Sequence, residues 1–362
     1  MKITHVTTHV INTPAENPLT FGLPTPPERH DYVVLELGTD QGLVGVGVTF
    51  FGAALNASLG VAVDSLARLL IGDDPSQTEA VAAKLRRAAS SAGPSGIFTL
   101  ALSAIDMACW DLKGKAAGKP LCELLGGLRD RVPTYASGAL TRPFPISYLE
   151  KAGPKLMEMG FRQMKMQCGS EPDYTTSVNR IRAMREAIGP DVDLMCDINQ
   201  LWSVHQAVEI GKRAEQYGLY WLEDPTTRDD YPGLARIADS LHTPIATGEY
   251  HYGITPFRHL LEHRSLDIVM IDLVRAGGIT QWMKIAGMAE AFNLPVVSHL
   301  IPEVHVHLIA AIPNGLTVEY MPRLYQFVKE TPSIENGMIV VPNRPGLGIE
   351  LDHAALKRFS AA

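Results

Sequence analysis

Five short apolar runs between residues 193 and 299 decide the fold. They are Asp193-Leu194-Met195-Cys196-Asp197, Leu219-Tyr220-Trp221-Leu222-Glu223, Pro244-Ile245-Ala246-Thr247-Gly248-Glu249, Asp267-Ile268-Val269-Met270-Ile271-Asp272 and Pro295-Val296-Val297-Ser298-His299. Each run has the length of a buried strand and ends in a carboxylate or a histidine, and the ends are 26, 26, 23 and 27 residues apart. Such spacing is typical of a strand-helix repeat. If the runs are successive barrel strands, the five end side chains project at the rim where (β/α)8 barrels carry their chemistry.

Three further β-rich runs extend this repeat to eight. They cover residues 132–138, 161–168 and 316–320, and amphipathic segments such as 178–188 and 204–217 lie between most of the runs. Strands that alternate with helices favour parallel β/α units. We therefore predict an α/β fold in which residues 127–322 form a modified TIM (β/α)8-type barrel.

The segments on either side of the barrel have a different character. Residues 1–50 are β-rich and predict a small antiparallel sheet, interrupted by a proline-studded loop at 14–30 that is long enough to cover a site. Residues 56–126 have helical periodicity. We predict an α+β capping domain at 1–126 and a turn-rich tail at 323–362 that packs back on it.

Composition excludes several classes of protein. Hydrophobic residues make up 46% of the 362 residues, charged residues make up 20%, and the formal net charge is −7. The sequence contains no block of Lys or Arg of the kind that binds nucleic acid, so we expect no nucleic-acid partner. It also contains no apolar stretch long enough for a membrane span. The N-terminus lacks the pattern of a signal peptide, and the four cysteines form no Cys-x-x-Cys pair. These features predict a cytoplasmic protein with reduced thiols.

Three of the strand-end acids form a candidate metal site. Asp197, Glu223 and Glu249 are hard oxygen donors on three neighbouring strands, and such donors suit an octahedral Mg2+ that keeps positions open for substrate oxygens. The alternative is that each acid caps a helix or forms a salt bridge at the rim. Three acids at this regular spacing favour the metal.

His299 and Asp272 form a candidate base. A lone histidine in this position is more often a satisfied group near a core. Asp272 on the preceding run changes this interpretation, because its carboxylate can accept the ring N–H of His299, fix the tautomer and stabilise the imidazolium.

Other polar residues fall inside the predicted barrel. Lys165 and Gln167 alternate with methionines and point inward if the methionines face the helices, although a lysine that reaches the rim is the alternative for Lys165. Glu319 in the last run is either a protonated hydrogen-bond donor or a salt-bridge partner.

Taken together, these residues resemble the mandelate racemase subgroup of the enolase superfamily. The resemblance covers essentially the whole chain and rests on Lys165-x-Gln167, Asp197-x-Asn199, Glu223-Asp224-Pro225, Gly248-Glu249, Asp272 before Arg275-Ala276-Gly277-Gly278, Ser298-His299, and Glu319. It implies a capping domain on a modified barrel and an enzyme that removes the proton next to a carboxylate. Mg2+ and electrophilic groups would stabilise the resulting enediolate.

The resemblance also implies a role for each matched residue. Asp197, Glu223 and Glu249 would bind Mg2+, and His299 with Asp272 would act as base or acid on one face of the substrate. Glu319 would donate a hydrogen bond to the substrate carboxylate. Lys165 would correspond to the first lysine of the Lys-x-Lys motif of this family.

Gln167 departs from the family pattern, because it occupies the position of the second lysine, the acid/base on the other face. An amide cannot exchange a proton at neutral pH, which weakens the straightforward racemase interpretation. Dehydration needs only His299, which can take the α-proton and then protonate a departing β-hydroxyl. We therefore expect a Mg-dependent lyase that dehydrates an acid sugar to a 2-keto-3-deoxy acid.

Several residues are candidates for binding the substrate, and two alternative functions stay open. Candidate substrate-binding residues are Gln167, Asn199, Tyr250, His30 and Phe51, and the loop residues suit sugar hydroxyls and apolar groups equally well. One alternative is an epimerase, a racemase or a lactone cycloisomerase on the same scaffold. A second is a non-catalytic metal-binding barrel. Proteins with this resemblance are often homo-oligomers.

Overall fold

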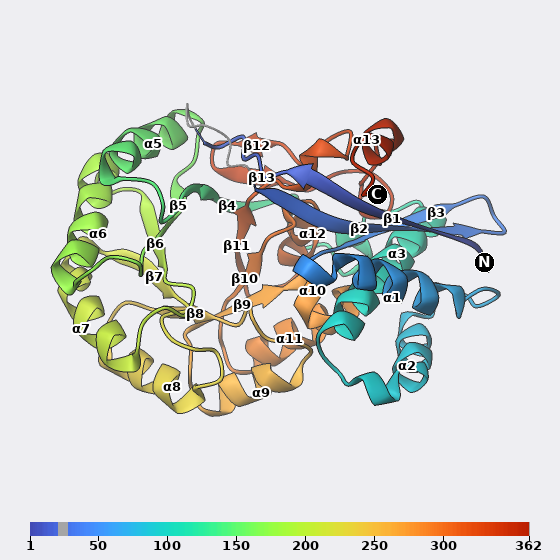
Figure 1. The fold of residues 1–362 in the computed structure, drawn as a ribbon, viewed down its shortest axis with the longest axis horizontal. Helices are drawn as coiled ribbons and strands as arrows, with labels where there is room; N and C mark the ends of the chain where they lie inside the picture. The colour runs from blue at the N-terminus through green and yellow to red at the C-terminus, as the bar shows by residue number, and fades with distance from the viewer. Residues whose placement is uncertain (21–27, 362) are drawn as a thin grey trace.

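A closed barrel and a smaller α+β layer make up the protein. The computed structural model describes residues 1–20 and 28–361. Figure 1 shows the helices of the barrel as a ring around its strands, with the N-terminal sheet and its helices on one side. Among the described residues, no helix has both the length and the apolar character needed to cross a membrane.

The N-terminal layer is a three-stranded antiparallel sheet covered by helices. Its strands are β1 (Ile3–Pro14), β2 (Arg29–Thr39) and β3 (Val44–Thr49), in the order β1-β2-β3, and its helices are α1 (Asn56–Arg68), α2 (Thr78–Ala88) and α3 (Ile97–Ala117). Helix α3 packs closely on β3, because Gly47 lacks a side chain there. A Cβ atom at Gly47 would lie 1.8 Å from the carbonyl oxygen of Ala104.

The predicted barrel is confirmed. Its eight strands are β4 (Arg131–Leu140), β5 (Gln163–Gln167), β6 (Asp193–Asp197), β7 (Leu219–Glu223), β8 (Ile245–Thr247), β9 (Ile268–Asp272), β10 (Val296–His299) and β11 (Gly315–Tyr320). Neighbours in this order pair in parallel, and β11 also pairs in parallel with β4, which closes the cylinder.

Helices connect the strands and surround the barrel. The longer ones are α5 (Ile146–Glu158), α6 (Tyr174–Ile188), α7 (Val204–Ala214), α8 (Tyr231–Ser240), α9 (Thr255–Glu262), α11 (Ile279–Ala291) and α12 (Pro302–Ala311). The short helices of the molecule are α4 (Leu121–Leu124), α10 (Leu273–Ala276) and the 3-10 turns η3 (Glu215–Tyr217) and η4 (Leu324–Gln326), and the 3-10 turns η1 (Ala53–Leu55) and η2 (Ser90–Ala92) belong to the N-terminal layer. Polar caps begin several of them: Asp173 accepts from the N–H of Thr176 at the start of α6, and Ser203 begins α7 with a capping box.

The C-terminal tail contacts both parts of the molecule. Its hairpin, β12 (Ile334–Glu335) and β13 (Met338–Val340), adds antiparallel to β4 of the barrel, and α13 (His353–Arg358) follows. The end of the tail then lies beside β1, where the N–H of Asn12 donates to the carbonyl of Phe359 and the N–H of Ala361 donates to that of Val10 (Figure 1). The tail thus contacts β1 of the N-terminal sheet, and its hairpin on β4 was not predicted from the sequence.

Inward-facing side chains fill the middle of the barrel. A buried cluster is formed by Tyr135, Met195, Trp221, Ala246, Ile268, Met270 and Val297. Because large apolar side chains close the cylinder at this level, polar groups at the carboxyl ends of the strands have room only above it. The indole N–H of Trp221 donates to Oε2 of Glu223 at 2.9 Å and so links the packed interior to the polar rim.

Candidate active site

Strand register brings the predicted site residues to one rim. Asp197 and Glu223 are paired last residues of β6 and β7, and Asp272 and His299 are paired last residues of β9 and β10. Glu249 follows β8 by two residues. The regular spacing of the sequence therefore becomes spatial convergence, because parallel strands in a closed barrel end at the same level.

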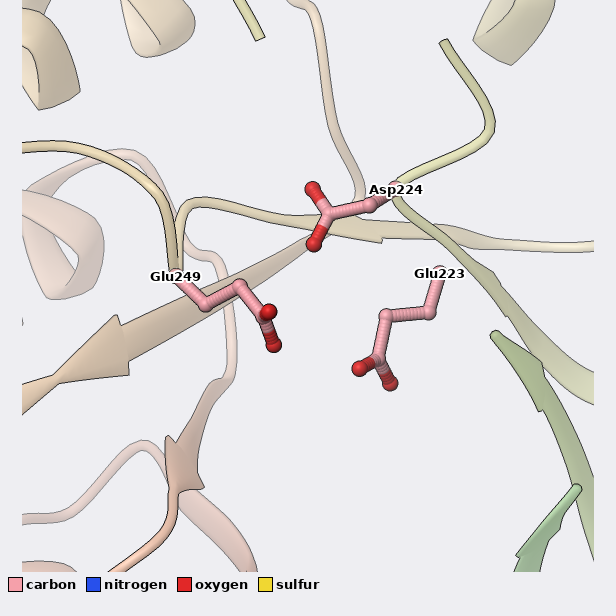
Figure 2. A group of neighbouring side chains, drawn as sticks. All are labelled: Glu223, Asp224 and Glu249. Carbon is pink, nitrogen blue, oxygen red and sulfur yellow. The ribbon is translucent and has the colours of Figure 1, made fainter. Parts of the chain in front are cut away.

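An acidic cluster lies at the centre of this rim. Ligand oxygens of Glu223, Asp224 and Glu249 all lie within 4.8 Å of one another, and Figure 2 shows the three carboxylates turned toward a common point. All three residues are buried, and within the described residues one oxygen of Asp224 has no hydrogen-bond partner, while Oε2 of Glu249 accepts no hydrogen bond and lies 3.2 Å from Nε2 of His299. Burial raises the pKa of Glu223 and of Glu249, and the neighbouring carboxylates raise it further. An all-oxygen donor set with this unbalanced negative charge fits Mg2+.

Asp197 lies beside this cluster. Its two carboxylate oxygens accept from the backbone N–H and the side-chain amide of Asn199, each at 2.8 Å, and Oδ2 lies 3.9 Å from Nζ of Lys165. Its charge also contributes to the raised pKa values of Glu223 and Glu249. The structure thus places Asp224 in the cluster together with two of the three predicted ligands, and a ligand role for Asp197 stays a prediction.

Lys165 points into the barrel and joins several carboxylates. Its Nζ lies 2.5 Å from Oε1 of Glu223 and 3.0 Å from Oε1 of Glu319, and the side chain is buried. Burial alone would lower the pKa of Lys165, but these carboxylates raise it well above its ordinary value. The amine is therefore a charged ammonium that offsets part of the acidic charge of the site.

Glu319 corresponds to the salt-bridge alternative. Besides Lys165, its carboxylate accepts from Oγ of Ser137 at 2.7 Å and from the backbone N–H of Leu300 at 2.5 Å. Burial would raise the pKa of Glu319, but Lys165 and these donors lower it to about 2. Among the described residues, each hydrogen-bond or ion-pair partner of the Glu319 carboxylate is a donor, and the carboxylate is ionised.

His299 and Asp272 form a buried dyad. Nδ1 of His299 lies 2.6 Å from Oδ2 of Asp272, while the other oxygen of Asp272 accepts from the backbone N–H of Arg275 at 2.6 Å. Nε2 of His299 faces the acidic cluster, 3.2 Å from Oε2 of Glu249. Burial lowers the pKa of His299, but Glu249 and Asp272 outweigh this and raise it. The dyad thus presents one ring nitrogen to the centre of the site, as a general base requires.

Aromatic and cationic side chains cover the dyad. The ring of Phe51 stacks over His299, with centroids 6.4 Å apart and planes 7° apart. The Arg275 guanidinium lies 3.8 Å from the centre of the Phe51 ring and 4.9 Å from that of Tyr250. Phe51 has a φ of 70°, a left-handed conformation that is costly for a residue with a side chain. Such local strain is typical of functional sites.

Gln167, Asn199 and Tyr250 form a polar wall. The amide of Gln167 donates to Oδ1 of Asn199 at 3.2 Å, and the amide of Asn199 lies 3.1 Å from the hydroxyl of Tyr250. Arg142, which follows β4, donates to the same Oδ1 at 2.6 Å. This wall carries hydrogen-bonding groups and one cation, and Gln167 contributes an amide, which cannot exchange a proton at neutral pH.

His30 and its loop are less closely tied to the site. His30 packs edge-on against Tyr32, with ring centroids 6.5 Å apart, and burial with the nearby Arg323 lowers its pKa to about 4. Within the described residues, no hydrogen bond or ion pair joins His30 to another predicted site residue. Residues 21–27 of the predicted covering loop lie outside the described part of the chain. Earlier in the loop, the amide of Asn17 lies 3.5 Å from the carbonyl oxygen of Ser137 on β4.

Three residues near the site were not singled out by sequence analysis. Asp224 belongs to the acidic cluster, Arg142 contacts the polar wall, and Arg275 binds the dyad and the Glu249 carbonyl. Asp224 and Arg275 stand within motifs that were quoted, so their positions beside Glu223 and Asp272 were a usable signal. The sequence contains no comparable signal for Arg142, because this residue reaches the site only when β4 lies beside β5.

Comparison with known proteins establishes the family. Residues 3–126 match the model of the mandelate racemase / muconate lactonizing enzyme N-terminal domain, and residues 148–355 match the model of the enolase C-terminal domain-like family. The chain belongs to the mandelate racemase/muconate lactonizing enzyme family of the enolase superfamily.

Members of this family with acid-sugar substrates are similar over most of the chain. An L-talarate/galactarate dehydratase of Salmonella typhimurium is 33% identical over 89% of this chain and 81% of its own length. A 3,6-anhydro-alpha-L-galactonate cycloisomerase of Streptomyces coelicolor is also 33% identical, over 91% of each chain. A crystal structure of L-talarate dehydratase from Polaromonas sp. JS666, complexed with Mg and L-glucarate, superposes with a TM-score of 0.92 at 35% identity, covering 100% of this chain and 98% of that one.

Proposed function

We propose that this protein is a Mg-dependent lyase that dehydrates an acid sugar to a 2-keto-3-deoxy acid. The observation that carries the proposal is the His299–Asp272 dyad facing the acidic cluster, with Gln167 in place of a second base. The dehydratases among the relatives, and the Mg and L-glucarate bound to one of them, support the same reaction class.

Asp197, Glu223 and Glu249 would hold the Mg2+, and Asp224 adds negative charge beside them. Hydrogen bonds from Asn199 orient Asp197, and the hydroxyl of Thr247 donates to Asp224. When bound, Mg2+ would supply positive charge that offsets the negative charge developing on the substrate carboxylate as the α-proton is removed.

His299 carries both proton transfers. Asp272 holds the proton on Nδ1, so the lone pair of Nε2 removes the α-proton of the substrate. A double bond then forms between the α- and β-carbons while the bond from the β-carbon to its hydroxyl oxygen breaks. The imidazolium returns its proton to that hydroxyl, which leaves as water. The resulting enol becomes the 2-keto-3-deoxy acid, so atoms and charge balance.

Lys165 and Glu319 stabilise and orient this step. The buried ammonium of Lys165 lies among the carboxylates and can offset negative charge that develops on the substrate carboxylate. Glu319 keeps that ammonium in place through its 3.0 Å contact. Gln167, Asn199, Tyr250, Phe51 and His30 are the proposed substrate-binding residues.

A lactone cycloisomerase is the second candidate. The 33% identity to a cycloisomerase favours it, because opening or closing such a ring needs the same dyad and no second base.

We also propose that the protein is a cytoplasmic homo-oligomer. Among the described residues the four cysteines are free and buried, which supports a reducing compartment, and the exposed apolar side chains of Leu55, Val61, Leu69 and Ile71 are available for contacts with a second copy.

A library of mono- and diacid sugars, incubated with the protein and Mg2+ and assayed for 2-keto acids, tests the proposal. We expect His299→Asn to abolish product formation while Mg2+ binding is kept, and His259→Asn on α9 to serve as the control with full turnover. Exchange of the α-proton in D2O without 2-keto acid would favour an isomerase. No turnover and no exchange with any acid sugar would support a non-catalytic metal-binding barrel.

A further inference from the structure

Glu303 is a buried carboxyl group without a partner. It is the second residue of α12, only 2% of its surface is exposed, and within the described residues neither side-chain oxygen has a hydrogen-bond partner. In the part of the chain that the structure describes, no hydrogen bond or ion pair joins its side chain to the acidic cluster or to the dyad.

An isolated buried carboxyl group is costly in either protonation state. The charged form loses its hydration, and the neutral form still has a hydroxyl that needs an acceptor. Burial raises the pKa of Glu303 to about 7, and its own backbone N–H offsets only part of this effect. A buried polar group in this condition is usually satisfied by something from outside the chain, either water or a ligand.

A cavity adjoins this carboxyl group. It has a volume of about 450 Å3 and lies between α12 and the C-terminal tail. Its lining combines Glu303 with tail residues of two kinds: apolar residues at Pro332, Val340, Val341, Pro342, Leu347 and Ile349, and polar residues at Glu330, Thr331, Ser333, Asn343 and Arg344. This volume is within the range of small-molecule sites.

The charged residues of the lining indicate which charge a ligand should carry. At the exposed edge, the Arg344 guanidinium already pairs with Glu330 at 2.6 Å. Among the described lining residues, Glu303 is therefore the carboxyl group without a charged partner, and its ionised form, which dominates above pH 7, is negative. A cationic donor balances this ionised carboxylate better than water or another neutral donor does, and the apolar walls favour a ligand whose remaining part is aliphatic. A hydrated metal ion would gain little from walls of valine, leucine and isoleucine.

We propose that this cavity is a binding site for a small organic ammonium ion, with the ammonium group on Glu303 and the aliphatic part against Val341, Leu347 and Ile349. Helix α12 packs on the outside of β4, β10 and β11. None of the proposed catalytic or metal-binding residues is among the described residues that line this cavity, so the inference does not depend on the proposed reaction.

Binding of n-butylammonium chloride to the full-length protein at pH 8 tests this site. Isothermal titration should show saturable binding, while 1-butanol and KCl at the same ionic strength should show none. We expect Glu303→Gln to weaken the affinity by about tenfold or more, because the amide keeps the shape and removes the charge. Glu330→Gln, at the exposed edge, is the matched control and should retain binding within about twofold.

A second variant keeps the test independent of folding effects at Glu303. Val341→Phe leaves the carboxyl group in place and fills part of the cavity, so it should also abolish saturable binding. Three results would overturn the proposal: no saturable binding to the unmodified protein, equal binding of 1-butanol or K+, or unchanged affinity in Glu303→Gln. Loss of binding in Glu330→Gln alone would place the ammonium at the edge and would overturn it as well.

Discussion

Replacing Asp272 with asparagine tests the central element of the proposed mechanism. The carboxylate is buried, its Oδ2 lies 2.6 Å from Nδ1 of His299, and its Oδ1 accepts from the backbone N–H of Arg275 at 2.6 Å. Asparagine has nearly the same shape and can still accept from Arg275. Its amide group can donate to His299, which then carries its proton on Nε2, the nitrogen that has to act as the base.

The expected loss follows from this change of tautomer. Positioned general-base catalysis contributes about 100- to 10,000-fold in rate. Loss of the base should therefore lower kcat by about the same factor, which corresponds to about 3–5 kcal/mol of transition-state stabilisation. KM should change little, because neither Asp272 nor His299 is a proposed contact to the substrate carboxylate. Global stability should fall by only about 1–3 kcal/mol, the effect of one charged hydrogen bond.

Steady-state formation of 2-keto acid and washout of the α-proton into D2O measure this effect separately from binding. Thermal unfolding checks that the variant is folded, and a Mg2+ titration checks the metal site. Asp267→Asn, just before the start of the same strand, is the matched control and should keep its turnover. A kcat for Asp272→Asn within about threefold of the unmodified protein would show that the dyad does not carry the proton transfer.

The remaining predictions concern proton exchange on the second face of the substrate, the buried carboxyl group of Glu303, and the contact between β3 and α3 at Gly47. Gln167→Lys should create or raise α-proton exchange from the second face, and unchanged stereochemistry of deuterium incorporation would show that residue 167 is not aimed at that carbon. Glu303→Gln should stabilise the fold by about 3 kcal/mol at pH 8, because a pKa raised from 4.5 to about 7 penalises the folded state by about 1.4 kcal/mol per tenfold change in proton affinity. This penalty is absent below pH 4.5, grows between pH 4.5 and 7 and is constant above, so denaturant titrations of both proteins should converge in acid. Gly47→Ala should destabilise by about 2 kcal/mol or more, since its Cβ would overlap the carbonyl of Ala104, whereas Gly287→Ala on α11 meets open space and should stabilise by up to about 1 kcal/mol. Equal melting temperatures for these two variants would contradict the packing argument.

Much of the barrel and its rim could be predicted from the sequence. The strand ends at Asp197, Glu223, Asp272 and His299 fall at the predicted residues, because a buried strand is a short apolar run and its end is where polarity returns. Once these runs are parallel neighbours, the convergence of their last side chains follows from the closed cylinder.

Contacts between side chains could not be predicted in the same way. Nothing in the local sequence shows that Lys165 lies 2.5 Å from Glu223, that Phe51 stacks on His299, or that Glu319 is held ionised by its donors. These features depend on strand shear, on rotamers and on how the N-terminal layer meets the barrel.

Sequence by itself therefore determined the eightfold repeat, the family resemblance and the chemical types of the groups at the rim, because these depend on periodicity and residue identity along one chain. Only the tertiary structure decided that Asp224 joins Glu223 and Glu249, that Arg142 reaches Asn199, and that the tail closes a cavity over Glu303. The physical reason is that distance, burial and charge balance are properties of segments remote in sequence, and they acquire values only when those segments pack.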